Sequence, residues 1–132
     1  VHPEGADYGD LWGRQYMPRH AEIAAVATDA GCYGLYYACG VPGMADLLMG
    51  MLVPPVVHVP NGLTMRVFPG GTYASVDCTV SAIGATWSAI YGEWLPSSGY
   101  VEDEARPAAE YYPPADMGPQ SPVTILVPIR RA

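Results

Sequence analysis

Residues 84–91 read GATWSAIY, and residues 9–16 read GDLWGRQY. The two stretches share the pattern G-x-x-W-x-x-x-Y at an offset of 75 residues, and the same offset places Tyr36-Tyr37 on Tyr111-Tyr112. The chain has only three tryptophans, and two of them take part in the match. We interpret the match as an internal duplication, so the fold is expected to consist of two similar units whose seam is a natural place for a ligand pocket.

The match extends over most of the chain. One residue of slippage, to an offset of 74, places Leu52-Val53-Pro54 on Leu126-Val127-Pro128. A chain of 132 residues is long enough for one compact domain with its own core. We therefore predict a single domain, residues 1–132, with unit one at 1–60 and unit two at 61–132.

Residue periodicity and turn signals predict the elements of each unit. The elements expected in unit one are helices at 6–17 and 19–28, a strand at 32–38, a helical turn or loop at 44–50 and extended chain at 51–58. Those expected in unit two are a hairpin of strands 63–68 and 72–78, a helix from Ser81 to Trp94, an acidic loop at 101–107, and strands 108–112 and 123–129. The predicted fold class is α+β: strand-helix-strand-strand units form one pseudo-twofold antiparallel sheet, with helices on one face and a central cleft.

The hairpin of unit two has no complete counterpart in unit one. At an offset of 75, the counterpart of strands 63–68 and 72–78 would lie mostly before Val1. We expect a first strand of ten or more residues to be missing from this chain, or to have been lost from unit one. A missing strand leaves backbone donors and acceptors unpaired unless another segment covers them.

The charge of the chain limits its partners. Thirteen acidic residues face six arginines, and the formal net charge is −7. This charge repels phosphate, so direct nucleic-acid binding by this chain is not expected, whereas a cationic partner is favoured.

Cysteine and histidine patterns predict neither a disulfide framework nor a metal site. Three cysteines without a C-x-x-C pair are typical of a protein from the reducing cytoplasm. The three histidines have no ligand spacing with one another or with the cysteines. No apolar run is long enough for a membrane span, and no nucleotide or redox-cofactor fingerprint occurs. We expect no metal, no cofactor and no membrane partner.

Strand alternation suggests which side chains could carry function. In strand 32–38, Tyr33, Leu35 and Tyr37 share one face. The offset of 75 equates Glu110 with Leu35 and Tyr112 with Tyr37. If that face lines the cleft, Glu110 lies among tyrosines; otherwise it lies on an exposed face.

Four segments carry a family resemblance, which spans nearly the whole chain: FPGGTYA at 68–74, WSAIYGEWLPSSGY at 87–100, EYY at 110–112 and LVPI at 126–129. They resemble the GyrI-like family, also called the effector-binding domain of bacterial transcription activators. The resemblance implies a pseudo-symmetric sheet with a cleft for planar, apolar, often cationic drugs or metabolites. It also implies one of four roles: ligand sensor fused to a DNA-binding domain, stand-alone drug binder, antagonist of a gyrase inhibitor, or hydrolase of cyclopropane-bearing DNA-alkylating natural products. Thr124 departs from the family, which commonly carries a glutamate there.

Two functions follow as hypotheses. The first is binding of a hydrophobic, aromatic small molecule, cationic or neutral, for sensing or sequestration. The second is hydrolysis of a reactive ligand, with Glu110 and Tyr112 as the acid-base pair. The expected ligand-binding residues are Tyr33, Leu35, Tyr37, Met49, Trp87, Tyr91, Glu110 and Tyr112, although core packing is an alternative role for Trp87 and Tyr91. A DNA-binding domain, fused or separate, and either a monomer or a homodimer are compatible with the sequence.

Overall fold

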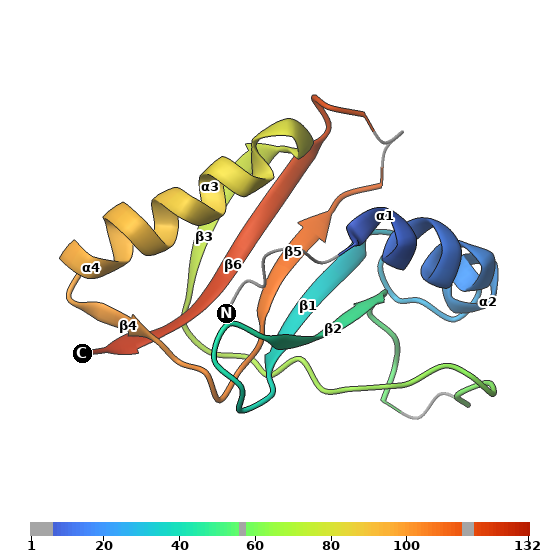
Figure 1. Ribbon diagram of the computed structural model, residues 1–132. Coiled ribbons are helices and arrows are strands. Elements are labelled where there is room, and N and C mark those ends of the chain that lie inside the picture. Colours follow the sequence, from blue (N-terminus) through green and yellow to red (C-terminus); the bar gives the residue numbers. More distant parts are fainter. Residues whose placement is uncertain (1–6, 56–57, 115–117) are drawn as a thin grey trace.

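The computed structural model describes residues 7–55, 58–114 and 118–132, and they form a mixed α+β fold (Figure 1). Its strands are β1 (Cys32–Ala38), β2 (Ala45–Gly50), β3 (Tyr73–Thr79), β4 (Tyr100–Glu102), β5 (Ala108–Tyr112) and β6 (Pro122–Arg131). Five strands follow the order β2-β1-β5-β6-β3, and β4 pairs with the end of β6. All these pairs are antiparallel. The central pair β1–β5 therefore joins the two halves of the chain.

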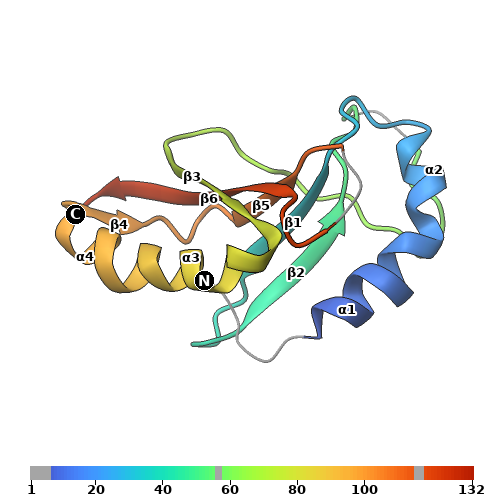
Figure 2. The same cartoon turned by 90° about the horizontal axis from the view of Figure 1, so that it is seen from above.

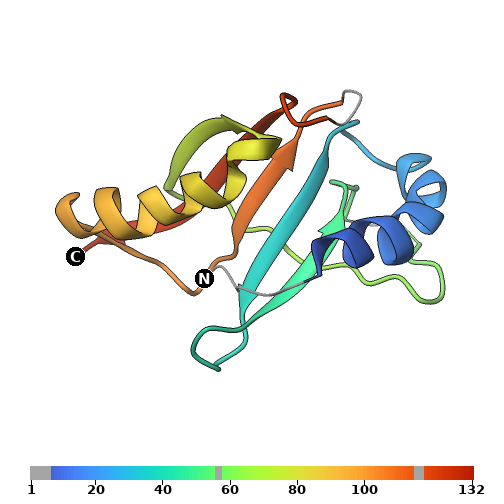
Figure 3. The same ribbon diagram turned by 45° about the horizontal axis from the view of Figure 1, so that its top comes forward.

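Two helical segments flank this sheet. The first, residues 8–24, consists of α1 (Tyr8–Asp10), a π-helical turn (Leu11–Tyr16), a 3₁₀ turn (Met17–Arg19) and α2 (His20–Ala24). The second, residues 80–97, consists of a 3₁₀ turn (Val80–Ala82), α3 (Ile83–Ala89), a π-helical turn (Ile90–Trp94) and α4 (Leu95–Ser97). Figures 2 and 3 show both segments on the same face of the sheet, the first beside β1 and β2 and the second beside β3 and β6. The expectation of helices on one face agrees with this arrangement.

The core lies between the second helical segment and the sheet. Alternate residues of β6 point toward the helices, and Ile125, Val127 and Ile129 are buried there. The side chains of Trp87 and Ile90, on the second helical segment, pack against these β6 side chains. Trp94, the last residue of the predicted helix, is 42% exposed and stacks on Tyr100.

Three predicted elements are wrong. Residues 100–102 form β4, because they pair with the end of β6, whereas an acidic loop was expected at 101–107. Residues 45–50 form a strand, because they pair with β1 over their whole length, whereas a helical turn or loop was expected at 44–50. Residues 63–68 form no strand. They cross the face of β1 that points away from the helices, where the Tyr37 hydroxyl donates to the Val67 carbonyl at 2.8 Å.

The start of the second helical segment also differs from the prediction. Ser81 does not cap it; its side-chain oxygen contacts Thr79 at 3.3 Å. The amides of Val80 and Ser81 instead donate to the carbonyls of Ser121 and Pro119, at 3.0 Å each. Backbone from the loop before β6 thus supplies the acceptors that a capping side chain would have provided.

Other predictions agree closely. Strands 32–38 and 108–112 have the expected bounds, and strand 72–78 is shifted by one residue to Tyr73–Thr79. Among the described residues, the sheet ends at β2 on the side of unit one and at β3 on the side of unit two. The internal duplication and the absent first strand stay predictions.

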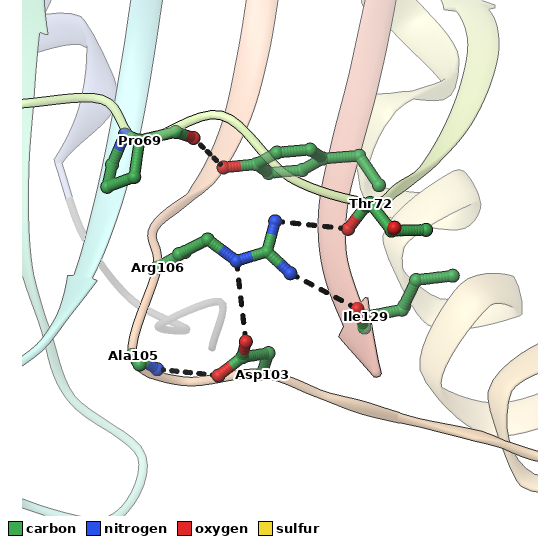
Figure 4. Close-up of polar contacts among 7 residues, drawn as sticks. Pro69, Thr72, Asp103, Ala105, Arg106 and Ile129 are labelled. Atoms are coloured by element: carbon green, nitrogen blue, oxygen red, sulfur yellow. Dashed lines mark hydrogen bonds and ion pairs between the residues drawn. The ribbon is translucent and has the colours of Figure 1, made fainter. Parts of the chain in front are cut away.

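Arg106 fixes the loop that leads into β5 (Figure 4). Its guanidinium donates to the carbonyls of Thr72 and Ile129, at 3.1 Å each, and its Nε forms an ion pair with Asp103 at 3.4 Å. A Cβ at Gly71 would collide with this guanidinium, so glycine is needed there. These contacts tie the loop to β3 and β6 and fix where β5 begins.

Candidate functional site

Glu110 is the buried carboxylate of the sheet, with 3% of its surface exposed. Three aromatic side chains of the described residues donate to it: the Tyr112 hydroxyl to Oε1 at 2.5 Å, and the Trp87 indole Nε1 and the Tyr36 hydroxyl to Oε2 at 2.6 and 3.0 Å. Burying a carboxylate costs free energy because water is lost, and these neutral donors replace part of that hydration. In each of these bonds the aromatic side chain donates and a carboxylate oxygen accepts.

The register of β1 against β5 explains why these groups meet. Glu110 lies opposite Gly34, and Tyr36 lies opposite Ala108. Directly opposed residues share a face, and so do residues two apart on a strand. Tyr36, Glu110 and Tyr112 therefore all point toward the helices, where α3 supplies Trp87.

Gly34 leaves room at the floor of this arrangement. A Cβ at this position would lie 3.5 Å from the Met49 sulfur, 3.6 Å from Trp12 Cζ2 and 3.8 Å from Glu110 Oε1. Side chains from β2, the first helical segment and β5 thus converge above one glycine. We call the converging side chains the Glu110 cluster: Trp12, Tyr36, Met49, Trp87, Glu110 and Tyr112.

Two aromatic pairs in the cluster have similar geometry. Trp12 meets Tyr112 edge-on, with ring centroids 5.3 Å apart and an interplanar angle of 75°. Trp87 meets Tyr36 at 5.5 Å and 74°. Trp12 and Trp87 therefore each contact a tyrosine on the central strand of the other half of the chain. Such contacts join the halves directly above Gly34.

The tyrosines of the cluster remain proton donors. Burial raises the pKa of Tyr36, and the negative charge of Glu110 raises it further. The same two causes, in the same order, raise the pKa of Tyr112. Tyr8, whose pKa burial also raises, hydrogen-bonds to Tyr36 from the start of α1. Both hydroxyls that face Glu110 are therefore held protonated well above neutral pH.

The predicted grouping of Glu110 with Tyr33 and Tyr37 is wrong. Tyr33, Leu35 and Tyr37 point to the opposite face of the sheet, because they alternate with Gly34 and Tyr36 along β1. There, Tyr33 packs edge-on against Phe68 at 5.9 Å, and the Arg66 guanidinium lies 3.6 Å from the centroid of the Tyr37 ring.

The error came from the offset. An offset of 75 equates Leu35 with Glu110, but Leu35 lies opposite Ala109 and on the other face. A shift of one residue reverses every side chain of a strand. In the central strands an offset of 76 equates Gly34 with Glu110 and Tyr36 with Tyr112. With this offset, the contact of Trp12 with Tyr112 and the contact of Trp87 with Tyr36 are equivalent in the two halves.

The remaining expected site residues do not all lie in the Glu110 cluster. Met49 belongs to the Glu110 cluster. Tyr91 stacks on Trp87 at 5.8 Å but donates its hydroxyl to Glu102 at 2.9 Å. Thr124 faces away from Glu110 and donates to Asp77 at 2.8 Å, so a carboxylate at its position would lie outside the cluster.

Sequence reasoning missed Tyr36, and it did not include Trp12 among the expected ligand-binding residues. The adjacent tyrosines Tyr36 and Tyr37 leave two choices for the hydroxyl that faces the helices, and the sequence offers no signal that decides between them. The spacing of four between Trp12 and Tyr16 fits core packing equally well.

An open groove of about 650 Å³ runs along β2, between the first helical segment and residues 58–68. Tyr33, Leu35 and Met49 line it, whereas Glu110 and Tyr112 do not. In the described ranges, no three histidine, cysteine or acidic side chains are arranged to hold a metal ion. No helix within the same ranges is both long and apolar enough to cross a membrane.

A comparison with protein families identifies the family of the chain. The family model described as Cass2, integron-associated effector binding protein, matches residues 3–129. The chain belongs to this family. Cass2 is a GyrI-like family, so the resemblance found in the sequence is confirmed at the level of effector binding, and a small-molecule ligand is supported. A comparison with curated proteins finds no match.

Proposed function

We propose that this Cass2-family protein binds a flat aromatic effector at the Glu110 cluster, most tightly when the effector is cationic. The observation that carries the proposal is a carboxylate, 3% exposed, that accepts three hydrogen bonds from aromatic side chains. The role we propose is cytoplasmic sensing or sequestration in a multidrug or toxin response. Sensing would further require a DNA-binding domain, fused or separate.

The chemistry of the cluster supports such a ligand. A cation held over aromatic faces gains up to ~2 kcal/mol when the contact is desolvated. Glu110 adds a direct electrostatic attraction, and the net charge of −7 draws cations toward the protein. Gly34 carries no Cβ, so a flat ring that enters above it would displace the side chains of Trp12 and Met49, which lie there beside Glu110.

Three acridines of similar shape test the proposal. At neutral pH, 9-aminoacridine is a cation, acridine is neutral and acridine-9-carboxylate is an anion. We expect affinity to fall in this order, measured by calorimetry and by quenching of tryptophan fluorescence. Glu110→Gln should weaken 9-aminoacridine about 10- to 100-fold, the effect of losing one desolvated charge contact. Glu93→Gln removes an equal charge from an exposed helix position and should change little. Equal affinity of Glu110→Gln and the wild type would contradict the proposal.

One observation favours a second function. Tyr112 donates to Glu110 at 2.5 Å, which is the arrangement of an acid-base pair. In a hydrolase, Glu110 would take a proton from a water whose oxygen bonds to a cyclopropane carbon. The ring C–C bond would break, its electron pair would move into a conjugated carbonyl, and Tyr112 would protonate that oxygen. Transfer of a proton from Glu110 back to Tyr112 completes the addition of one water.

Mass spectrometry separates the two functions. Incubation with a spirocyclopropyl dienone would give a ring-opened product heavier by one water if the protein is a hydrolase. Turnover should then vanish in both Glu110→Gln and Tyr112→Phe. Stoichiometric binding without product would exclude hydrolysis of this substrate class.

A further inference from the structure

A second pocket lies at the turn between β1 and β2. It has a volume of about 540 Å³ and is lined by residues 38–44, by Tyr91 of the second helical segment, and by Glu102 and Glu104 at and after the end of β4. This volume is within the range of small-molecule sites, roughly 300–1,000 Å³. Of its lining residues, only Tyr91 was expected to contact a ligand.

The pocket is connected to the Glu110 cluster by a stack of two aromatic rings. Tyr91 and Trp87 lie nearly parallel, with centroids 5.8 Å apart and an interplanar angle of 8°. The Trp87 indole donates to Glu110 at 2.6 Å, and the Tyr91 hydroxyl donates to Glu102 at 2.9 Å. One aromatic stack therefore has a carboxylate at each end, one buried in the cluster and the other lining the pocket.

The lining of the pocket selects for positive charge on an apolar body. Glu102 and Glu104 are acidic, and none of the described residues that line the pocket is arginine, lysine or histidine. Val41 and Met44, which are 51% and 58% exposed, supply apolar surface on the side of the turn. Burial and the charge of Glu102 both raise the pKa of Tyr91, so its hydroxyl remains a donor to that carboxylate.

We propose that the effector is an elongated dication, with one positive group at Glu110, an aromatic body along the Trp87–Tyr91 stack and a second positive group at Glu102. This inference rests on the proposed binding function and specifies the class of ligand. The two charged groups must be separated by a spacer that spans two stacked rings. A compact monocation uses only the Glu110 end.

A matched pair of probes tests the proposal: 1,5-bis(4-amidinophenoxy)pentane, and the same molecule with one amidine replaced by hydrogen. We expect the bis-amidine to bind the wild type about tenfold more tightly than the mono-amidine, as one additional partly exposed ion pair provides. In Glu102→Gln this ratio should fall to about one, while the affinity of the mono-amidine stays unchanged. Glutamine can still accept the Tyr91 hydrogen bond, and Glu93→Gln controls for the loss of net charge.

The outcomes distinguish the two proposals. One outcome is that the mono-amidine binds, that this binding is lost in Glu110→Gln, and that the wild type does not prefer the bis-amidine. It would overturn the proposal of an elongated dication and leave the proposed function intact. A preference that persists in Glu102→Gln would overturn the role of Glu102. If neither probe bound and the acridines also failed, both proposals would fall together.

Cys39 offers a readout at the pocket itself. Its thiol is exposed and lies in the lining, whereas Cys32 and Cys78 are half-buried. At saturating concentrations, the bis-amidine should slow alkylation of Cys39 by N-ethylmaleimide, and the mono-amidine should not. Peptide mass spectrometry measures the rate at each cysteine. Equal rates with the two probes would contradict occupation of the pocket.

Discussion

Both faces of β1 carry tyrosine, but they differ in what covers them. On the helix face, Tyr36 is 1% exposed and donates to a buried carboxylate. On the other face, Tyr37 donates to the backbone of Val67, within a segment that has no regular structure. The same residue type, one position apart, thus belongs to a closed polar cluster in one case and to a surface contact in the other. Residue type alone does not distinguish a buried site from a surface contact. The residues that pack against each face of the strand do.

Replacing a tryptophan on the helix face should have the largest effect. Trp87→Phe removes the indole donor to Glu110 and part of a side chain that is 2% exposed. We expect a loss of about 2–4 kcal/mol in the free energy of unfolding, from the cavity and from the lost bond to a carboxylate. Urea denaturation measures it. Trp94→Phe, on the same helical segment but 42% exposed, should cost less than about 1 kcal/mol. Similar losses for the two variants would contradict the assignment of Trp87 to the core.

The adjacent tyrosines provide the most direct comparison of the two faces. Tyr36→Phe should destabilise the protein by about 1–3 kcal/mol, because Glu110 loses a buried donor. Tyr37→Phe should cost about 0.5 kcal/mol, since water can replace the hydroxyl at the Val67 carbonyl. Urea midpoints for the two variants measure the difference. A larger loss for Tyr37→Phe would reverse our assignment of the faces.

At alkaline pH, the free energy of unfolding should depend on pH more steeply in the wild type than in a variant without the Tyr36 hydroxyl. The pKa of Tyr36 is raised above 10.0, its ordinary value, so the folded state retains a proton that the unfolded state releases. Its contribution to stability is complete below pH 10 and declines as pH rises further, by about 1.4 kcal/mol per pH unit. Between about pH 9 and pH 11.5, the stability of Tyr36→Phe should therefore fall less steeply than that of the wild type, by about one proton. Parallel pH profiles would show that Tyr36 ionises normally.

The smallest effect on stability is expected at the floor of the cluster. Gly34→Ala places a methyl group at ordinary contact distance from Met49, Trp12 and Glu110, so stability should change by less than about 1 kcal/mol. Binding of 9-aminoacridine should nevertheless weaken, because the methyl group occupies the space proposed for the ligand. Gly50→Ala, with no atom within 4 Å of its Cβ position, is the matched control. Unchanged affinity in Gly34→Ala would place the ligand elsewhere.

The sequence predicted the secondary-structure elements better than it predicted which face of the sheet each side chain occupies. The bounds of β1 and β5 were correct because each is a short aromatic run next to glycine or proline. The segment 63–68 has the apolar character of a strand but lies across a sheet face, which depends on tertiary contacts that no local pattern encodes. Glu110 was identified from the chain alone, whereas its partners Tyr36 and Trp87 are 74 and 23 residues away. Their contact depends on the register of β1 against β5, and a one-residue error in the offset assigns each side chain to the wrong face of the sheet.

The position of β2 at the end of the sheet has a consequence for the behaviour of the protein at high concentration. In the part of the chain that is described, β2 pairs only with β1, so its outer edge presents backbone donors and acceptors in the spacing that another strand requires. Leu52, Met65 and Val67 are exposed along the adjoining groove. Natural sheets protect such edges with charge, and here Asp46 is the charged residue of β2. Asp46 is 3.9 Å from the Arg66 guanidinium, so charge of both signs lies at this edge, and Asp46→Asn should lower the concentration at which the protein self-associates.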